Sequence, residues 1–252
     1  MSHYYEILPN FEAKFLEEVT TGPQARKHSS VCAASVTTKL KYEPNEFLER
    51  WAKKQCIKLS RENPGKTEDE ILDLAWGVRE HPNGTTVPSS DFGTELHKEF
   101  ENATMAYHQG LNYRSKWFQE WTDLWVDWLS KHKAEVEGVE LLVGDATRRT
   151  AGAIDQLLSI DGKMVLADFK TRVAGGSALS SKHYSKDCMQ LAVEADIVRM
   201  KYNLDYMPRI YTIIVECTKP DMYVKLWTLP AQEKGLAKFD VINDFYNKLN
   251  DL

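Results

Sequence analysis

The chain lacks long apolar runs and has few cysteines. Its richest apolar stretch, from Trp117 to Leu129, is broken by several polar and acidic residues and falls short of the roughly 18 consecutive apolar residues that indicate a membrane-spanning helix. The start of the sequence has neither the basic segment nor the apolar segment of a secretory signal, so we expect a cytoplasmic protein. The cysteines are too scattered for a C-x-x-C pair or a zinc knuckle, which favours free thiols at Cys32, Cys56, Cys188 and Cys217.

An excess of positive charge is also absent. The 252 residues include 32 Lys and Arg against 37 Asp and Glu, which gives a net charge of −5. This balance argues against a protein that coats nucleic acid through bulk attraction, although a local basic groove remains compatible with it. A content of 42% hydrophobic and 27% charged residues is that of an ordinary folded protein and excludes a disordered chain.

The two halves of the chain differ in the spacing of their apolar residues. From residue 11 to about 132 these recur at helical spacing, whereas from 136 to 228 they form short runs with turn signals between them. We predict one structural domain of α/β class, in which a helical N-terminal part (1–135) packs on a core (136–252) with a central mixed β-sheet flanked by helices. The expected helices are 10–19, 45–60, 67–80, 92–109, 114–131, 186–202 and 236–249; the expected strands are 136–143, 152–160, 163–171, 209–217 and 222–228, with a loop over 81–90.

A two-residue turn at Asp161-Gly162 lies between two apolar runs and predicts a β-hairpin. Cross-strand pairing around this turn places Asp155 opposite Asp168, with Cβ atoms about 4.5–5.5 Å apart. Because strand residues alternate in direction, Lys170 points to the same side as Asp168. The hairpin therefore gathers two acids and one amine in one patch, and its apolar flanks predict cover on both faces.

Two facing carboxylates repel each other unless a cation or a shared proton offsets their charge. Mg²⁺ suits such a pair, because it binds through one or two carboxylates and completes its shell with water and phosphate oxygens. Asp155, Asp168 and Lys170 are thus the candidate catalytic residues. The competing interpretation is an exposed edge hairpin with a surface salt bridge.

At this point the sequence resembles the PD-(D/E)XK nuclease superfamily, within it the RecB-like branch that includes phage exonucleases. The matching pieces occur in the family's order: Ser35-Val-Thr-Thr38 leading to Leu48-Glu-Arg-Trp-Ala52, Gly93-Thr-Glu-Leu-His97, Gly152-Ala-Ile-Asp155, Asp168-Phe-Lys-Thr171 and Gln190-Leu-Ala-Val-Glu194. The resemblance implies a restriction-endonuclease-like core with a helical N-terminal half. Its departures are Asp168 at a position often held by Glu, and Glu194 where the branch often has Tyr.

The resemblance also implies roles for individual residues. Asp155, Asp168, the Phe169 carbonyl and His97 would hold Mg²⁺, with Mn²⁺ expected to substitute, and Lys170 would orient the attacking water or help to deprotonate it. No iron–sulfur cluster is expected, because the chain has no clustered C-terminal cysteines. The residues expected at DNA are Gln190, Thr171, Ser35, Thr37 and Thr38. Without the resemblance, His97 would be interpreted as a surface histidine.

Other residues near the hairpin admit two interpretations. Arg148, Arg149 and Arg172 would grip DNA phosphates or belong to ordinary solvated loops. Glu140 and Glu194 would be neighbouring acids behind the metal ligands, and Glu140 is equally compatible with a solvated strand position.

The sequence therefore predicts a Mg²⁺-dependent deoxyribonuclease that hydrolyses phosphodiester bonds. An exonuclease in DNA recombination, repair or degradation is favoured, with a phage as a plausible source and the host cytoplasm as its place of action. The expected partners are DNA with a free end and a single-strand-binding or recombination protein, and no membrane. The alternatives are a structure- or site-specific endonuclease and a nuclease-like module that binds DNA or protein without cutting.

Overall fold

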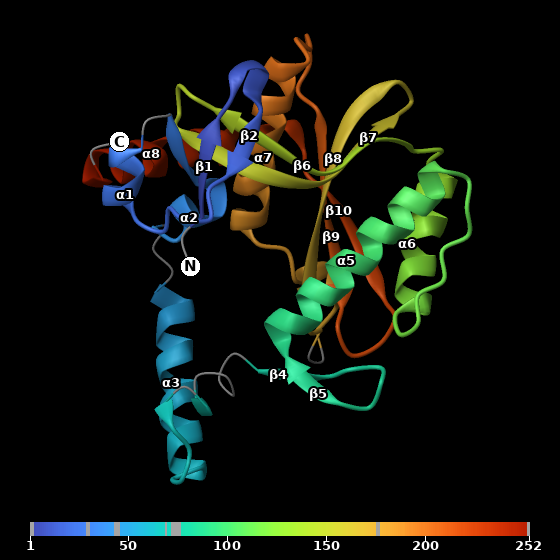
Figure 1. Ribbon diagram of the computed structural model, residues 1–252. Helices are drawn as coiled ribbons and strands as arrows, with labels where there is room; N and C mark the ends of the chain where they lie inside the picture. The colour runs from blue at the N-terminus through green and yellow to red at the C-terminus, as the bar shows by residue number, and fades with distance from the viewer. Residues whose placement is uncertain are drawn as a thin grey trace.

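The computed structural model describes residues 3–28, 31–42, 46–68, 70–71, 77–174 and 177–250 (Figure 1). Its elements in chain order are β1 (Tyr4–Ile7), η1 (Pro9–Phe11), β2 (Ala13–Phe15), α1 (Gly22–Lys27), β3 (Cys32–Ser35), α2 (Val36–Leu40), α3 (Glu46–Glu62), β4 (Val78–Glu80), β5 (Thr86–Pro88), α5 (Ser89–His108), α6 (Gln119–Lys131), β6 (Glu135–Asp145), β7 (Thr150–Ile160), β8 (Lys163–Arg172), η2 (Leu179–Ser181), α7 (Ser185–Lys201), β9 (Arg209–Glu216), β10 (Met222–Leu226) and α8 (Leu229–Asn250).

Strand β7 is the branch point of the main sheet. Strand β6 pairs with it antiparallel along most of its length. A strand has only two edges, so the other two partners share the opposite edge: β3 pairs in parallel at Thr150 and Ala151, and β8 pairs antiparallel over Gln156–Ile160. Beyond β8 the sheet continues with β9, which is parallel to it, and then with antiparallel β10.

The N-terminal strands close one end of this sheet into a ring. Strand β3 pairs with β1, β1 pairs with β2, and a bridge between Glu12 and Val143 joins the start of β2 to β6. The strands β6, β7, β3, β1 and β2 thus form a closed mixed barrel, and β8, β9 and β10 extend from it. The prediction of a helical N-terminal half over a central sheet of restriction-endonuclease type is therefore wrong.

The physical reason lies in the length and pairing of the missed strands. β1, β2 and β3 have three or four residues each, which is too short for a period of two to stand out. The helix expected over 10–19 is replaced by η1 and β2. Only residues 81–85 of the loop expected over 81–90 connect two elements as a loop: β5 occupies 86–88 and pairs with β4, and α5 begins at Ser89. Much of the helix expected over 67–80 lies outside the described residues, and its last three residues form β4.

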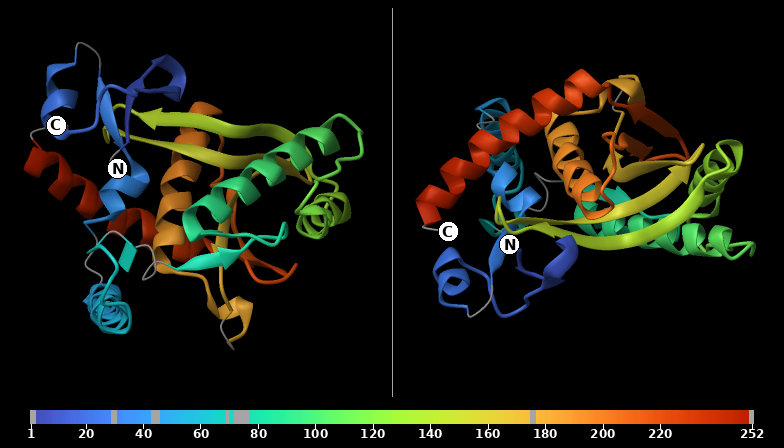
Figure 2. Two further views of the ribbon diagram at one scale, coloured as in Figure 1. Left: turned by 60° about the horizontal axis from the view of Figure 1, so that its bottom comes forward. Right: turned by 90° about the horizontal axis from the view of Figure 1, so that it is seen from above.

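Two apolar cores cover the two faces of the β7–β8–β9 sheet, as the hairpin pattern predicted. On one face, α7 and α8 pack on Leu157, Leu166 and Ile210. On the other, α5 and α6 pack on Leu158, Val165, Phe169 and Ile213. Figure 2 shows the long α8 crossing one side of the molecule beside α7, with α5 and α6 at the other end. No helix among the described residues is long and apolar enough to cross a membrane.

Candidate active site

The β7–β8 hairpin forms as predicted. Asp161 and Gly162 both have positive φ, 54° and 71°, which is the backbone that an Asp-Gly hairpin turn requires. The pairing runs from Ile160–Lys163 to Gln156–Ala167, and the next pair in that register is Asp155 with Asp168. The Asp155 Oδ2 atom reaches across the hairpin and accepts a hydrogen bond of 2.8 Å from the Phe169 backbone N–H.

Asp168 lies at the centre of the polar contacts. Its side chain is almost fully buried, and its Oδ2 forms an ion pair of 2.6 Å with Lys170 Nζ. Its Oδ1 accepts a hydrogen bond of 3.1 Å from Gln190 Nε2 on α7. Lys170 Nζ also donates to Gln190 Oε1 at 3.4 Å. The predicted alternation is thus confirmed, because Asp168 and Lys170 both face α7.

Glu194 lies one helical turn beyond Gln190 and is 1% exposed. Its Oε1 accepts a second hydrogen bond, of 3.2 Å, from the same Gln190 Nε2. A Cβ atom at Gly152 of β7 would lie 2.7 Å from this oxygen, so the glycine is what lets the carboxylate approach the strand. Gln190 therefore connects a buried acid on the helix to a buried acid on the strand.

The charges of this cluster perturb one another. Burial, and then the Asp168 charge, raise the pKa of Asp155 well above its ordinary value. The same two causes raise the pKa of Glu194. Burial by itself would lower the pKa of Lys170, but the Asp168 and Asp155 carboxylates outweigh it and raise that pKa. Lys170 is thus held as an ammonium ion in a site with an excess of acid.

His97 lies on α5, which packs on the face of the sheet opposite to α7. Its Nδ1 atom lies 3.5 Å from Asp155 Oδ2, and its ring meets the edge of Phe169 at a centroid distance of 5.8 Å. Burial lowers the pKa of His97, which favours the neutral ring. A Cβ atom at Gly93 would lie 3.1 Å from Thr171 Oγ1, so this glycine permits the close approach of α5 to β8 one turn before His97.

Glu140 lies on β6 between the pairs Val139–Gln156 and Leu141–Ile154, in register with Asp155. Its backbone has a φ of 50°, a region that side-chain-bearing residues seldom adopt. Burial, and then the charge of Glu101, raise its pKa. The residue as a whole is still accessible to solvent, so the structure places this partly shielded acid at the rim of the site.

The remaining predicted DNA contacts divide into those beside the hairpin and those elsewhere. Arg172 Nη2 donates to Asp187 Oδ1 at 3.2 Å, and its guanidinium lies over the Tyr184 ring. Thr171 lies one residue before it on β8 and is partly exposed. Sequence reasoning missed Asp187, although its position three residues before Gln190 on α7 puts both on one helix face. The two side chains line a cavity of about 160 Å³ with Thr37, Leu40, Lys41 and Lys186.

The hydroxyls of Ser35 and Thr38 form hydrogen bonds that stabilise the start of α2. Ser35 is the N-cap of α2, and its Oγ accepts from the Thr38 backbone N–H at 3.0 Å. Ser35 Oγ also donates to Thr38 Oγ1 at 2.8 Å, and both residues are buried. Thr37 between them is exposed. Of these three predicted phosphate contacts, the structure therefore leaves the Thr37 side chain open to solvent.

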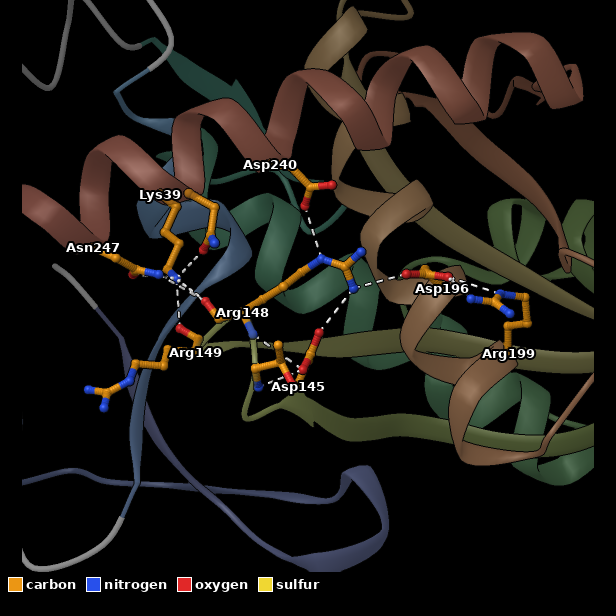
Figure 3. A network of polar contacts seen from close by, with 10 residues as sticks. Lys39, Asp145, Arg148, Arg149, Asp196, Arg199, Asp240 and Asn247 are labelled. Carbon is orange, nitrogen blue, oxygen red and sulfur yellow. Dashed lines mark hydrogen bonds and ion pairs between the residues drawn. The ribbon is translucent and has the colours of Figure 1, made fainter.

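Arg148 belongs to a separate ionic network (Figure 3). Its guanidinium forms ion pairs of 2.9 Å with Asp145, Asp196 and Asp240. The neighbouring Arg149 carbonyl accepts a hydrogen bond of 2.6 Å from Lys39 Nζ, while the exposed Arg149 side chain points away from the network. Arg148 thus joins the β6–β7 turn to α7 and α8.

The donor set at the hairpin is compatible with Mg²⁺. Within the described residues, no group of three or more His, Cys, Asp or Glu side chains is arranged to hold a metal ion. Mg²⁺ does not require such a group, because one or two carboxylates with water and substrate oxygens are its usual shell. Asp155 and Asp168 offer two carboxylates; burial and then the Asp168 charge raise the pKa of Asp155, and a bound cation would offset the second of these causes.

Comparisons with known proteins do not identify the chain. No protein-family model matches it, and no curated protein matches it. A solved structure titled "Crystal structure of SSO0001" shares 13% sequence identity over 85% of this chain and 82% of that chain, with a TM-score of 0.36. A similarity of that size carries no argument about fold or function.

Proposed function

We propose that this protein is a Mg²⁺-dependent deoxyribonuclease that hydrolyses phosphodiester bonds at the β7–β8 hairpin, with exonuclease action favoured. The observation that carries the proposal is the arrangement around Asp168, a buried carboxylate held between Lys170 at 2.6 Å and Gln190 at 3.1 Å, with Asp155 on the adjacent strand. The ordered motifs that resemble RecB-like members of the PD-(D/E)XK superfamily support it.

The residues divide the chemistry between them. Asp155 and Asp168 would hold the cation, which when bound supplies a Lewis acid that neutralises charge growing on a phosphate. Because its pKa is raised, Lys170 is a cationic hydrogen-bond donor to a phosphate oxygen or to the attacking water, and at neutral pH it is not a base. Gln190 fixes the positions of Asp168 and Lys170, and Glu194 fixes Gln190.

The protein would act on DNA ends inside a cell. The substrate is DNA with a free end, and the place of action is a cytoplasm, that of the host if the source is a phage. A single-strand-binding or recombination protein would be its partner in DNA recombination or repair. Neither the partner nor the setting is needed for the test of the reaction.

Cleavage of labelled DNA by the purified protein tests the proposal. Linear and circular DNA, single- and double-stranded, are incubated with Mg²⁺, with Mn²⁺ or with EDTA. We expect linear DNA to be cut only when metal is present. Cutting of closed circles would show an endonuclease, and binding without any cutting would contradict the enzymatic proposal and favour a non-cutting module.

Variants on the hairpin make the test specific. Asp168→Asn and Lys170→Gln remove one charge each and should lower the cleavage rate by on the order of 10²-fold or more. Asp161→Asn and Lys163→Gln make the same chemical changes at exposed positions of the same hairpin and should cut as the parent does. Equal rates for the two pairs of variants would contradict the assignment of the site.

A further inference from the structure

Helix α3 carries a group of exposed cations that the site does not use. Lys53, Lys54, Lys58 and Arg61 are all exposed. Figures 1 and 2 show α3 projecting away from the sheet and from the helices that cover it. A cationic helix in this position stands out in a chain whose net charge is −5.

The four cations lie on one side of the helix. At about 100° per residue, Lys53, Arg61, Lys54 and Lys58 fall at about 0°, 80°, 100° and 140°, which is well under half of the helix circumference. From Lys53 to Arg61 the rise is about 12 Å. We call these four side chains the basic face of α3. Ile57 lies within this face and is 53% exposed.

Among the α3 side chains that the structure describes, from residue 53 onward with residue 55 excepted, the charge of the face is only weakly compensated. Lys58 Nζ lies 3.8 Å from Glu62 Oε1, and both side chains are more than half exposed. An exposed pair of this kind contributes little and is easily exchanged for another anion. The basic face therefore offers a compact, solvated patch of positive charge.

We propose that the basic face of α3 binds the phosphate backbone of duplex DNA. Charge complementarity selects this partner, because a duplex presents one negative charge per about 1.7 Å, or about seven charges along the 12 Å of the face. The inference deepens the proposed function and rests on it for the identity of the substrate. In this arrangement α3 binds the phosphate backbone, and the residues of the β7–β8 hairpin hydrolyse the phosphodiester bond.

Salt-dependent binding in EDTA, where metal-dependent cleavage is suppressed, tests the inference. The full-length variant Lys54→Gln/Lys58→Gln/Arg61→Gln removes three of the four cations, and Gln retains the helix propensity of Lys and Arg. The matched control Arg114→Gln/Lys116→Gln/Lys131→Gln makes the same change at exposed positions before and at the end of α6. Fluorescence anisotropy of a labelled duplex gives Kd between 50 and 200 mM NaCl.

Four phosphate contacts by the basic face contribute about −3.6 to the slope of log K against log salt, which is a loss of about 150-fold in affinity over this range. Removal of three of them should make the slope of the α3 variant less steep by about 2.7, so over this range the variant should lose about 40-fold less affinity than the parent, and at 50 mM NaCl it should bind more weakly than the parent. The control variant should keep the parent's slope. Equal slopes for the α3 variant and the parent, or a parent that binds no duplex, would overturn the inference.

Two further measurements distinguish DNA binding by α3 from membrane binding and from the proposed nuclease activity. If the α3 variant loses binding to vesicles of phosphatidylcholine with phosphatidylserine and keeps its DNA affinity, the face serves a membrane surface and the inference is overturned. If the α3 variant loses DNA affinity but the parent cuts no DNA with Mg²⁺, the basic face is supported and the proposed nuclease activity fails.

Discussion

Replacement of Gly152 by alanine tests how the buried acid and amide are held behind the candidate site. The glycine lies on β7 under Glu194, and an added Cβ would lie 2.7 Å from its Oε1 and 3.3 Å from its Cγ. Ordinary contacts begin near 3.4 Å, so the Glu194 carboxylate must shift by about 0.7 Å. Glu194 is 1% exposed, which leaves it little room to move.

Overpacking of a buried position costs about 1–3 kcal/mol. We expect Gly152→Ala to lower the free energy of unfolding by about 2 kcal/mol, which corresponds to a fall in Tm of about 4–8 °C for a chain of this length. Urea unfolding followed by circular dichroism measures the free energy, and a thermal scan measures Tm. The cleavage rate should also fall, because Gln190 links Glu194 to Asp168.

Two comparisons isolate the cause. Gly138→Ala on neighbouring β6 adds a Cβ whose nearest atom is 3.7 Å away, and it should leave stability almost unchanged. In a Glu194→Ala background, Gly152→Ala should cost less than about 0.5 kcal/mol, because the crowded carboxylate is gone. Equal costs of Gly152→Ala in the two backgrounds, or a Gly152→Ala protein as stable as the parent, would refute the packing argument.

Three further predictions concern buried charges. Burial lowers the pKa of Lys39 to about 7, so above that pH the folded protein binds fewer protons than the unfolded chain. The free energy of unfolding, measured by urea titration at each pH, should therefore rise from pH 7 toward 10. Lys39→Met should abolish this rise. The pKa of Glu194 is raised in the folded protein, so the free energy of unfolding of the metal-free protein should fall as pH increases above the ordinary carboxylate range. In the same urea titrations, Glu194→Gln should remove this part of the pH dependence. Arg148→Met should cost about 3 kcal/mol because it removes the cation that pairs with the buried Asp145 carboxylate, while Asp196 keeps its ion pair with Arg199. Arg149→Met at an exposed position should leave stability unchanged. Equal Tm values for the two variants would count against the network.

The hairpin was predictable because its signals are local. Asp161-Gly162 specifies the turn, and the turn fixes which residues face each other across the strands. The alternation of direction then puts Asp168 and Lys170 on one side, where the structure finds them in contact. The helices α5 and α7 are long enough for their apolar spacing to be read directly, and both occur close to the expected bounds.

The N-terminal strands were not predictable in the same way, because their partners are remote in sequence. Strand β3 pairs with β7 more than a hundred residues later, and nothing in Cys32–Ser35 indicates that partner. Ser35 shows the same limit at the level of a side chain, since its hydroxyl is used as a helix cap. Arg148 looked like a phosphate contact, but Asp196 and Asp240 lie far along the chain and take its guanidinium.

The central claim is that the buried carboxylates of the hairpin support metal-dependent cleavage. The most direct test is the initial rate at which linear duplex DNA is cut in Mg²⁺ by the parent, by Asp168→Asn and by Asp161→Asn. The account predicts equal rates for the parent and Asp161→Asn, and a rate for Asp168→Asn that is lower by on the order of 10²-fold. Equal cutting by all three proteins, or no cutting by the parent, would contradict it.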